Sequence, residues 1–205
     1  MVVAKGLDHP WGLAFLPEGR LLVTERAGRM RIIERDGRLN EPLTGLPPVV
    51  AAGQGGLLDV VLHPQFASNQ LVYWSFSEAG DGGAGTAVAR GKLDGNRIAD
   101  VQVIFRQQPK VSGGNNHFGS RLVWSRDGKK LFVGLGDRFT RKDDAQTLDN
   151  HMGKVVRIEA DGKVPADNPF VATPGAKPEI WSLGHRNMQG AALHPDTGEL
   201  WATEH

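Results

Sequence analysis

The chain repeats one short pattern, and its first copy reads Gly12-Leu-Ala-Phe-Leu-Pro-Glu-Gly-Arg-Leu-Leu-Val-Thr-Glu25. With one inserted residue, the pattern returns as Gly190-Ala-Ala-Leu-His-Pro-Asp-Thr-Gly-Glu-Leu-Trp-Ala-Thr-Glu204. A third copy reads Arg121-Leu-Val-Trp-Ser-Arg-Asp-Gly-Lys-Lys-Leu-Phe-Val-Gly134, and residues 59–74 fit more loosely. Each copy places short apolar runs on either side of a turn, which predicts a pair of antiparallel strands.

The spacing of the copies indicates a repeated sheet. The copies recur about 47, 62 and 69 residues apart, measured between their anchors Pro17, Pro64, Arg126 and Pro195. A second half-pattern follows in the same order, since residues 28–37 resemble residues 153–162. Units of this length are typical of β-propeller blades, four-stranded sheets that bury their faces against neighbouring blades. An open β-sandwich with similar strands is the alternative.

We therefore predict an all-β fold, with residues 1–205 forming one partial β-propeller domain. Its blade-like repeats lie near 9–50, 51–110, 111–180 and 181–205, the last of them incomplete. The chain would then supply roughly three and a half blades of four-stranded antiparallel sheet. At a mean spacing of roughly 60 residues, a ring of six blades needs on the order of 360 residues. We expect the chain to be the front part of such a ring, whether by truncation, cleavage or engineering.

Composition excludes several classes of protein. The chain has 205 residues and no cysteine, so it has no disulfide, thiolate metal site or cysteine nucleophile. Its 24 basic and 23 acidic residues nearly cancel, which gives no electrostatic case for a nucleic-acid partner. No apolar run approaches the roughly 20 residues of a membrane span. The segment Met1–Lys5 has no signal-peptide character, so we expect any export signal to be absent from this chain.

Three irregular segments precede the first strand of a repeat, and such segments meet at one end of a propeller channel. In the first, Gly53–Gly56, the amide of Gln54 could bind a hydroxylated ligand, and a tight glycine turn is the structural alternative. In the third, Gly184–Gly190, Arg186 offers a fixed fork of donors and Asn187 an amide. A surface ion pair and an ordinary turn would explain the third segment equally well.

The second segment, Gly113–Arg121, carries His117 in a loop of glycine and asparagine. Histidine can act as a general base near neutral pH, and such a base needs a carboxylate to orient it. Asp137 follows the strand pair that begins at Arg121, so a hairpin would return it to the same end of the sheet as His117. A histidine that hydrogen-bonds a backbone carbonyl is the structural alternative.

Other catalytic motifs are missing from the sequence. The glycine loop lacks the Lys-Ser/Thr of a phosphate-binding loop, and there is no Gly-x-Ser-x-Gly elbow. His63, His185 and His194 lack zinc-type spacing, and no loop fits the EF-hand pattern. Spacing alone therefore predicts no metal site.

Seven motifs, taken in order, carry a family resemblance. They are His9–Phe15, Leu22–Arg26, Gly53–Asp59, Asn116–Leu122, Gly134–Asp137, Met152–Arg157 and Leu183–Gly190. Together they resemble the soluble PQQ-dependent aldose sugar dehydrogenases of the glucose/sorbosone dehydrogenase family, over essentially the whole chain. The resemblance implies a six-bladed β-propeller that holds pyrroloquinoline quinone (PQQ) on its channel face, with Ca²⁺ at the cofactor. It also implies a quinoprotein oxidoreductase that oxidises the C1 hydroxyl of aldoses to the lactone.

The resemblance further implies roles for the residues on the substrate side. His117 matches the general base, which takes the proton from the anomeric hydroxyl while hydride passes to the quinone. Asp137 matches the carboxylate that orients this histidine. Gln54 and Asn116 match substrate-binding positions, and relatives can carry Asp at the second of them.

On the cofactor side, Arg186 matches the residue beside the reactive quinone carbonyl, so it has both a catalytic and a cofactor-binding role. Asn187 and Gln189 match further cofactor contacts. Met188 stands where many relatives have proline, which leaves the loop less rigid. The family's calcium ligands lie mainly beyond His205, as do the basic residues that hold the quinone's carboxylates. We therefore expect the isolated chain to lack activity, and its metal ligands are unknown.

The expected partners are an aldose, an electron acceptor such as a dye, a quinone or a cytochrome, and a second chain or copy that completes the ring. The expected location is the periplasm or the outside of the cell. One alternative is a non-catalytic propeller that binds a glycan or a protein, which would need neither a base nor its orienting partner. Another is a propeller lactonase or hydrolase, which would need acidic loops around a metal ion.

Overall fold

The computed structural model describes residues 2–205, whose regular structure is almost entirely β-strand. The first sheet contains β1 (Pro10–Phe15), β2 (Leu21–Glu25) and β3 (Arg29–Ile33). The second contains β4 (Leu57–Leu62), β5 (Leu71–Gly80), β6 (Gly83–Asp94) and β7 (Arg97–Arg106). The third contains β8 (Gly119–Trp124), β9 (Lys130–Leu135), β10 (Lys154–Glu159) and β11 (Ile180–Leu183), and the fourth contains β12 (Met188–Leu193) and β13 (Leu200–Glu204).

Helical structure within residues 2–205 consists of three short turns. They are α1 (Phe66–Asn69) and the 3₁₀ turns η1 (Pro17–Gly19) and η2 (Lys142–Gln146). Over the same residues no helix has the length and apolar character needed to cross a membrane.

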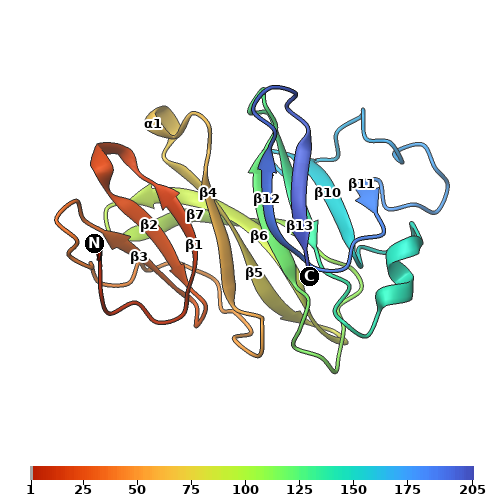
Figure 1. Ribbon diagram of the computed structural model, residues 1–205, viewed down its shortest axis with the longest axis horizontal. Coiled ribbons are helices and arrows are strands. Elements are labelled where there is room, and N and C mark those ends of the chain that lie inside the picture. The colour runs from red at the N-terminus through yellow and green to blue at the C-terminus, as the bar shows by residue number, and fades with distance from the viewer. Residues whose placement is uncertain (1) are drawn as a thin grey trace.

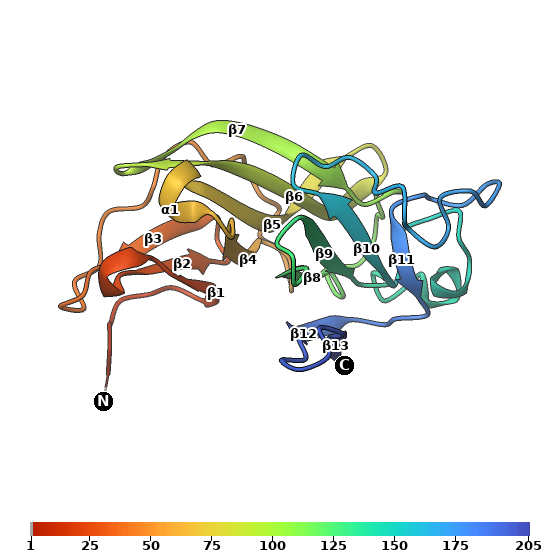
Figure 2. The same cartoon turned by 90° about the horizontal axis from the view of Figure 1, so that it is seen from above.

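The sheets are arranged around a common centre. Figure 1 shows them side by side, and within each sheet neighbouring strands are antiparallel and follow chain order. Seen from above in Figure 2, β1, β4, β8 and β12 gather near the centre, whereas β3, β7 and β11 lie farther out. The inner strands contact one another in sequence, β1 with β4, β4 with β8 and β8 with β12. The prediction of a partial propeller of antiparallel sheets is confirmed.

The two faces of the second sheet belong to different cores, as do those of the third, because successive side chains on a strand point to opposite faces. On β5, Trp74 joins a core shared with the first sheet, and the adjacent Tyr73 joins a core shared with the third sheet. On β9, Leu131 faces the second sheet, whereas Phe132 packs with Met188 of the fourth. The second and third sheets are therefore each wedged between two neighbours, which fixes the position of the loops at their inner edges.

Two details differ from the expected repeats. The first sheet has three strands instead of four, because the segment after β3 pairs only intermittently: Asn40 N–H donates to Ile32 O and Leu43 N–H to Met30 O. Pro42 lies between these donors and has no N–H of its own. The third sheet extends to Leu183, beyond the predicted boundary near residue 180. The division of the chain into blade-like repeats stays a prediction.

The packing between sheets predicts the effect of a core truncation. Leu131→Ala removes a fully buried side chain at the interface of the second and third sheets, and we expect it to lower the free energy of unfolding by about 2–5 kcal/mol. Val171→Ala, at an exposed loop position, is the matched control and should change it by less than about 0.5 kcal/mol. Urea titration followed by tryptophan fluorescence measures both, and equal effects of the two substitutions would contradict the packing described here.

Candidate active site

The three predicted loops meet at one end of the sheets, around the carboxylate of Asp137. His117 Nδ1 and Asp137 Oδ1 form a hydrogen bond of 2.7 Å, and Arg186 Nη1 donates to Asp137 Oδ2 over the same distance. His117 and Asp137 are 5% and 1% exposed, whereas 41% of the Arg186 side chain is exposed. The geometry is thus a buried acid–base pair with a cation on its solvent side.

The strand pair β8–β9 brings His117 and Asp137 together as a hairpin. The backbone at the end of this hairpin is very tight, because a Cβ atom at Gly136 would lie 2.0 Å from His117 O. Only glycine allows so close an approach. His117 itself has a φ of 54°, and the adjoining Phe118 O accepts a hydrogen bond from Thr86 Oγ1 in the second sheet. The loop that carries the imidazole is therefore anchored to two sheets.

Gln54, in the loop before β4 of the second sheet, supports the same loop. The side-chain Oε1 of Gln54 accepts a hydrogen bond from the backbone N–H of His117 over 2.8 Å, and the backbone N–H of Gln54 donates to Asn115 O. Gln54 and Asn116 are both exposed, and Asn116 directly precedes His117 in the chain. The Gln54 oxygen thus fixes the histidine backbone, and its place beside His117 suits the predicted substrate-side position.

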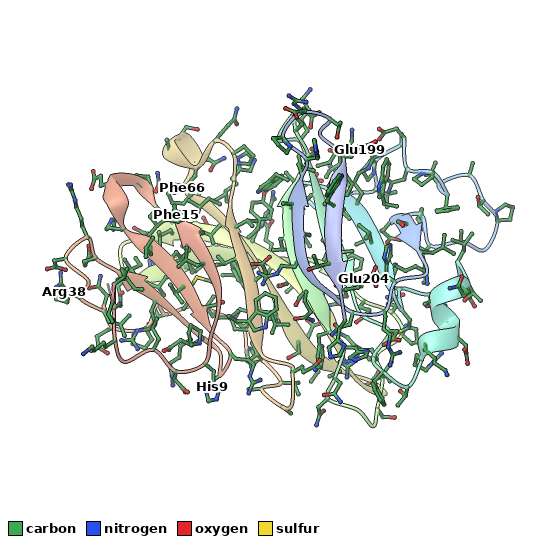
Figure 3. All side chains as sticks on the ribbon, viewed as in Figure 1. His9, Phe15, Arg38, Phe66, Glu199 and Glu204 are labelled. Atoms are coloured by element: carbon green, nitrogen blue, oxygen red, sulfur yellow. The ribbon has the colours of Figure 1, made fainter. Side chains whose placement is uncertain are left out.

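The loop that carries Arg186 is held by a carboxylate that the sequence analysis did not single out. Glu204 accepts hydrogen bonds from the backbone N–H of Arg186 over 2.7 Å and from His185 Nδ1 over 2.6 Å. Burial raises the pKa of Glu204, but these hydrogen bonds outweigh that effect, and the pKa lies below its usual value. Figure 3 shows Glu199 and Glu204 at opposite ends of β13, which places this loop at the end where Glu204 lies.

A second unforeseen support is the buried ammonium group of Lys154. Its Nζ donates to Asp144 O, Ala145 O and Met152 O over 2.9, 3.1 and 2.6 Å. Ala145 O also accepts the N–H of Gly184, so the lysine stiffens the base of the Arg186 loop. Burial lowers the pKa of Lys154 to about 8.

The remaining predicted residues surround a cavity of about 190 Å³ near the centre of the sheets. Its walls include Gln54, Asn187 and Gln189, together with residues that the sequence analysis did not assign to the site, namely Trp11, Arg26, Phe118, Gly119 and His205. Asn187 is buried and its Oδ1 accepts the backbone N–H of Gly119, whereas Gln189 is exposed. Guanidinium and amide donors around an indole ring are suited to a flat, acidic, carbonyl-bearing ligand.

Met188 differs from the expectation of a looser loop at this position. It is 1% exposed, and a Cβ atom at Gly134 would lie 2.5 Å from its sulfur. The methionine is therefore packed tightly into the interface of the third and fourth sheets. The roles of the site residues remain predictions. The structure places these residues at one end of the sheets, around the Asp137 carboxylate and the cavity of about 190 Å³.

Known proteins are similar to this chain in sequence. A sequence model of the family described as Glucose / Sorbosone dehydrogenase matches residues 7–205. The chain is 49% identical over 209 residues to aldose sugar dehydrogenase YliI of Escherichia coli (strain K12), an alignment that covers 100% of this chain and 55% of that protein. The chain thus spans about half the length of the curated relatives that it matches.

Solved structures share the fold. The soluble aldose sugar dehydrogenase of Escherichia coli, in its apo-form, matches with a TM-score of 0.94 at 48% identity, covering 100% of this chain and 59% of that one. The PQQ-bound form of the aldose sugar dehydrogenase of Streptomyces coelicolor matches with a TM-score of 0.82 at 33% identity, covering 100% and 58%. Both alignments extend over all three loops of the candidate site.

The buried lysine gives a pH-dependent prediction. Between about pH 8 and the usual lysine pKa of 10.5, the unfolded chain holds a proton that folded Lys154 has lost, so this residue makes the free energy of unfolding rise with pH. Lys154→Met removes that contribution. The difference in free energy of unfolding, wild type minus variant, should therefore be flat below about pH 7 and rise from about pH 8 to about pH 10.

Urea titrations of the two proteins at several pH values measure this difference. The exposed Lys129 supplies the matched control, because Lys129→Met should give a difference with no rise over the same interval. A wild-type-minus-variant difference for Lys154→Met that falls with pH would show that the ammonium is stabilised by its site.

Proposed function

The chain belongs to the glucose/sorbosone dehydrogenase family, and from that premise we propose that it carries the base and the orienting groups of a PQQ-dependent aldose dehydrogenase. The observation that supports this most directly is the sequence of contacts from His117 through Asp137 to Arg186, with two distances of 2.7 Å. A buried imidazole oriented by a buried carboxylate is a recurrent arrangement for proton abstraction. Oxidation of a sugar hydroxyl begins with that proton.

The carboxylate determines which nitrogen of His117 acts as the base. Ionised Asp137 can only accept, so the hydrogen bond between them puts the proton of a neutral imidazole on Nδ1. The lone pair is then on Nε2, the nitrogen that makes no bond to Asp137. We infer that Nε2 takes the proton of the anomeric hydroxyl as the C1–H bond breaks and its electron pair leaves as hydride.

The balance of the reaction identifies what must be bound beside the base. The aldose loses one proton to His117 and one hydride, and its C1 becomes the carbonyl carbon of the lactone. PQQ, when bound, supplies the two-electron acceptor for this hydride. In this proposal Arg186 stabilises negative charge that develops on the acceptor oxygen, and Asp137 holds the guanidinium in place.

The residues of this chain suit PQQ better than they suit its calcium ion. Arg26, Asn187 and Gln189 present donors to an acidic quinone from the wall of the cavity, and Arg186 belongs to the same loop as Asn187. For Ca²⁺, residues 2–205 contain no group of three or more His, Asp or Glu side chains placed to hold a metal ion. The proposal therefore assigns calcium no ligand set among these side chains.

The partners and location follow from the proposed reaction. We propose that the reduced cofactor is reoxidised by a dye, a quinone or a cytochrome, and that the complete protein works in the periplasm or outside the cell. Its substrate class is aldoses. A binding propeller without catalysis has less support, because burying an acid–base pair is costly for a protein that binds without proton transfer.

Substitutions in the acid–base pair test the proposal in the full-length protein, with PQQ, Ca²⁺, glucose and a dye acceptor. We expect His117→Ala to lower kcat by about 100-fold or more, because the anomeric proton then lacks an acceptor. Asp137→Asn should lower kcat by a similar factor, since its amide no longer favours the productive tautomer. Asp127→Asn, in an exposed turn, is the control and should match the wild type. Turnover retained by His117→Ala would remove this histidine from the mechanism, and PQQ absorption titrations of each variant separate loss of chemistry from loss of cofactor.

A further inference from the structure

Phe139 is a large apolar side chain that the fold holds at the surface, beside the proposed base. It is 52% exposed, and its ring lies edge-on to the imidazole of His117, with the ring centroids 5.1 Å apart and the planes at 80°. The guanidinium carbon of Arg186 lies 5.3 Å from the same phenyl centroid. An exposed aromatic ring between a buried base and a cation is a feature that packing of the core does not explain.

The backbone that presents this ring adopts an unfavourable conformation. Arg138 and Phe139 have φ values of 55° and 64°, in the left-handed region that bulky residues rarely occupy. Two consecutive residues of this kind persist only where surrounding contacts enforce them, and such sites are often functional.

Contacts on both sides of the segment enforce it here. Phe139 N–H donates to Asp137 Oδ1 over 2.8 Å, the same oxygen that orients His117. The Arg138 guanidinium is fully buried, lies 3.5 Å from the ring centroid of Phe118 and donates to Gly114 O. The segment is thus anchored under the site while Phe139 projects from it, so the ring has a fixed position relative to the base.

The chemistry of this arrangement is that of a sugar-binding surface. A pyranose with equatorial hydroxyls has faces made of C–H groups, which pack on aromatic rings, while its hydroxyls bind polar groups at the rim. Here the ring provides the apolar surface, and Gln54, Asn116 and His117 provide the polar groups nearby. An axial hydroxyl directed at the ring would lose hydration without gaining a hydrogen bond.

We propose that Phe139 is the apolar platform on which the C–H face of the aldose lies, and that it selects sugars whose hydroxyls are equatorial. This inference rests on the proposed function of the site and assigns to it a specificity-determining residue. The ring contacts the sugar and leaves binding of the quinone unaffected. Removing it should therefore weaken sugar binding with little change in kcat.

The test uses the full-length protein with PQQ and Ca²⁺ and a series of variants. For Phe139→Ala we expect the KM for glucose to rise roughly five- to tenfold, with kcat changed by less than about twofold. Phe139→Leu keeps apolar bulk without a flat face, so its KM should also rise, whereas Phe139→Tyr should restore it. Arg141→Ala, at an exposed position two residues further along the chain, is the control for the loop and should match the wild type.

A binding measurement provides a readout apart from turnover. The sugar 1,5-anhydroglucitol lacks the anomeric hydroxyl, so it binds without being oxidised at C1, and calorimetry should show the same fold-increase in its Kd as in the KM for glucose. The platform would be overturned by an unchanged Kd in Phe139→Ala or by a Phe139→Leu variant equal to the wild type. It would also be overturned if Phe139→Ala lost affinity for PQQ and kept its affinity for the sugar. If His117→Ala is inactive and Phe139→Ala is normal in all these measurements, only the platform fails, whereas an active His117→Ala variant rejects the proposed function itself.

Discussion

The carboxylate of Asp137 accepts hydrogen bonds from three directions, and the geometry of the candidate site depends on it. His117 and Phe139 share one oxygen, and Arg186 binds the other. A buried carboxylate needs such donors, because an ionised group without them is strongly destabilised inside a protein. The same requirement fixes the imidazole tautomer, the position of the guanidinium and the projection of the exposed aromatic ring. One buried charge thereby organises segments as far apart in the chain as those that carry His117 and Arg186.

The sheets make that meeting possible. Because successive sheets pack against one another, the inner strands β1, β4, β8 and β12 are held near a common centre, and the loops before them meet at one end (Figure 2). Residues outside the proposed reacting groups then hold the Arg186 loop in position. Lys154 binds three carbonyls at the base of the Arg186 loop, and Glu204 binds the backbone of that loop directly. The proposed reaction uses few residues, but their positions depend on interfaces between sheets.

Much of this arrangement could be predicted from the sequence, because repeats and turns are local signals. Short apolar runs on either side of a turn predicted the antiparallel strands, and the predicted hairpin correctly brought His117 and Asp137 together. The repeat also contained an unused signal: Glu204 aligns with Glu25, which likewise accepts a backbone N–H just before the first strand of its sheet. The left-handed backbone at Phe139 and the buried ammonium of Lys154 could not be predicted, since they result from tertiary contacts that override local preference. Pro42 was visible in the sequence, but its place between the two residues that donate to β3 was not.

In the proposed reaction, Asp137 keeps the lone pair of His117 on Nε2, toward the sugar. Nitrogen-15 NMR of the histidine side chains tests it most directly, with the His117 signals assigned by their absence from a His117→Gln variant. We predict that the neutral imidazole carries its proton on Nδ1 and leaves Nε2 unprotonated, and that Asp137→Asn loses this preference. A neutral His117 that carries its proton on Nε2 in the wild-type protein would contradict it.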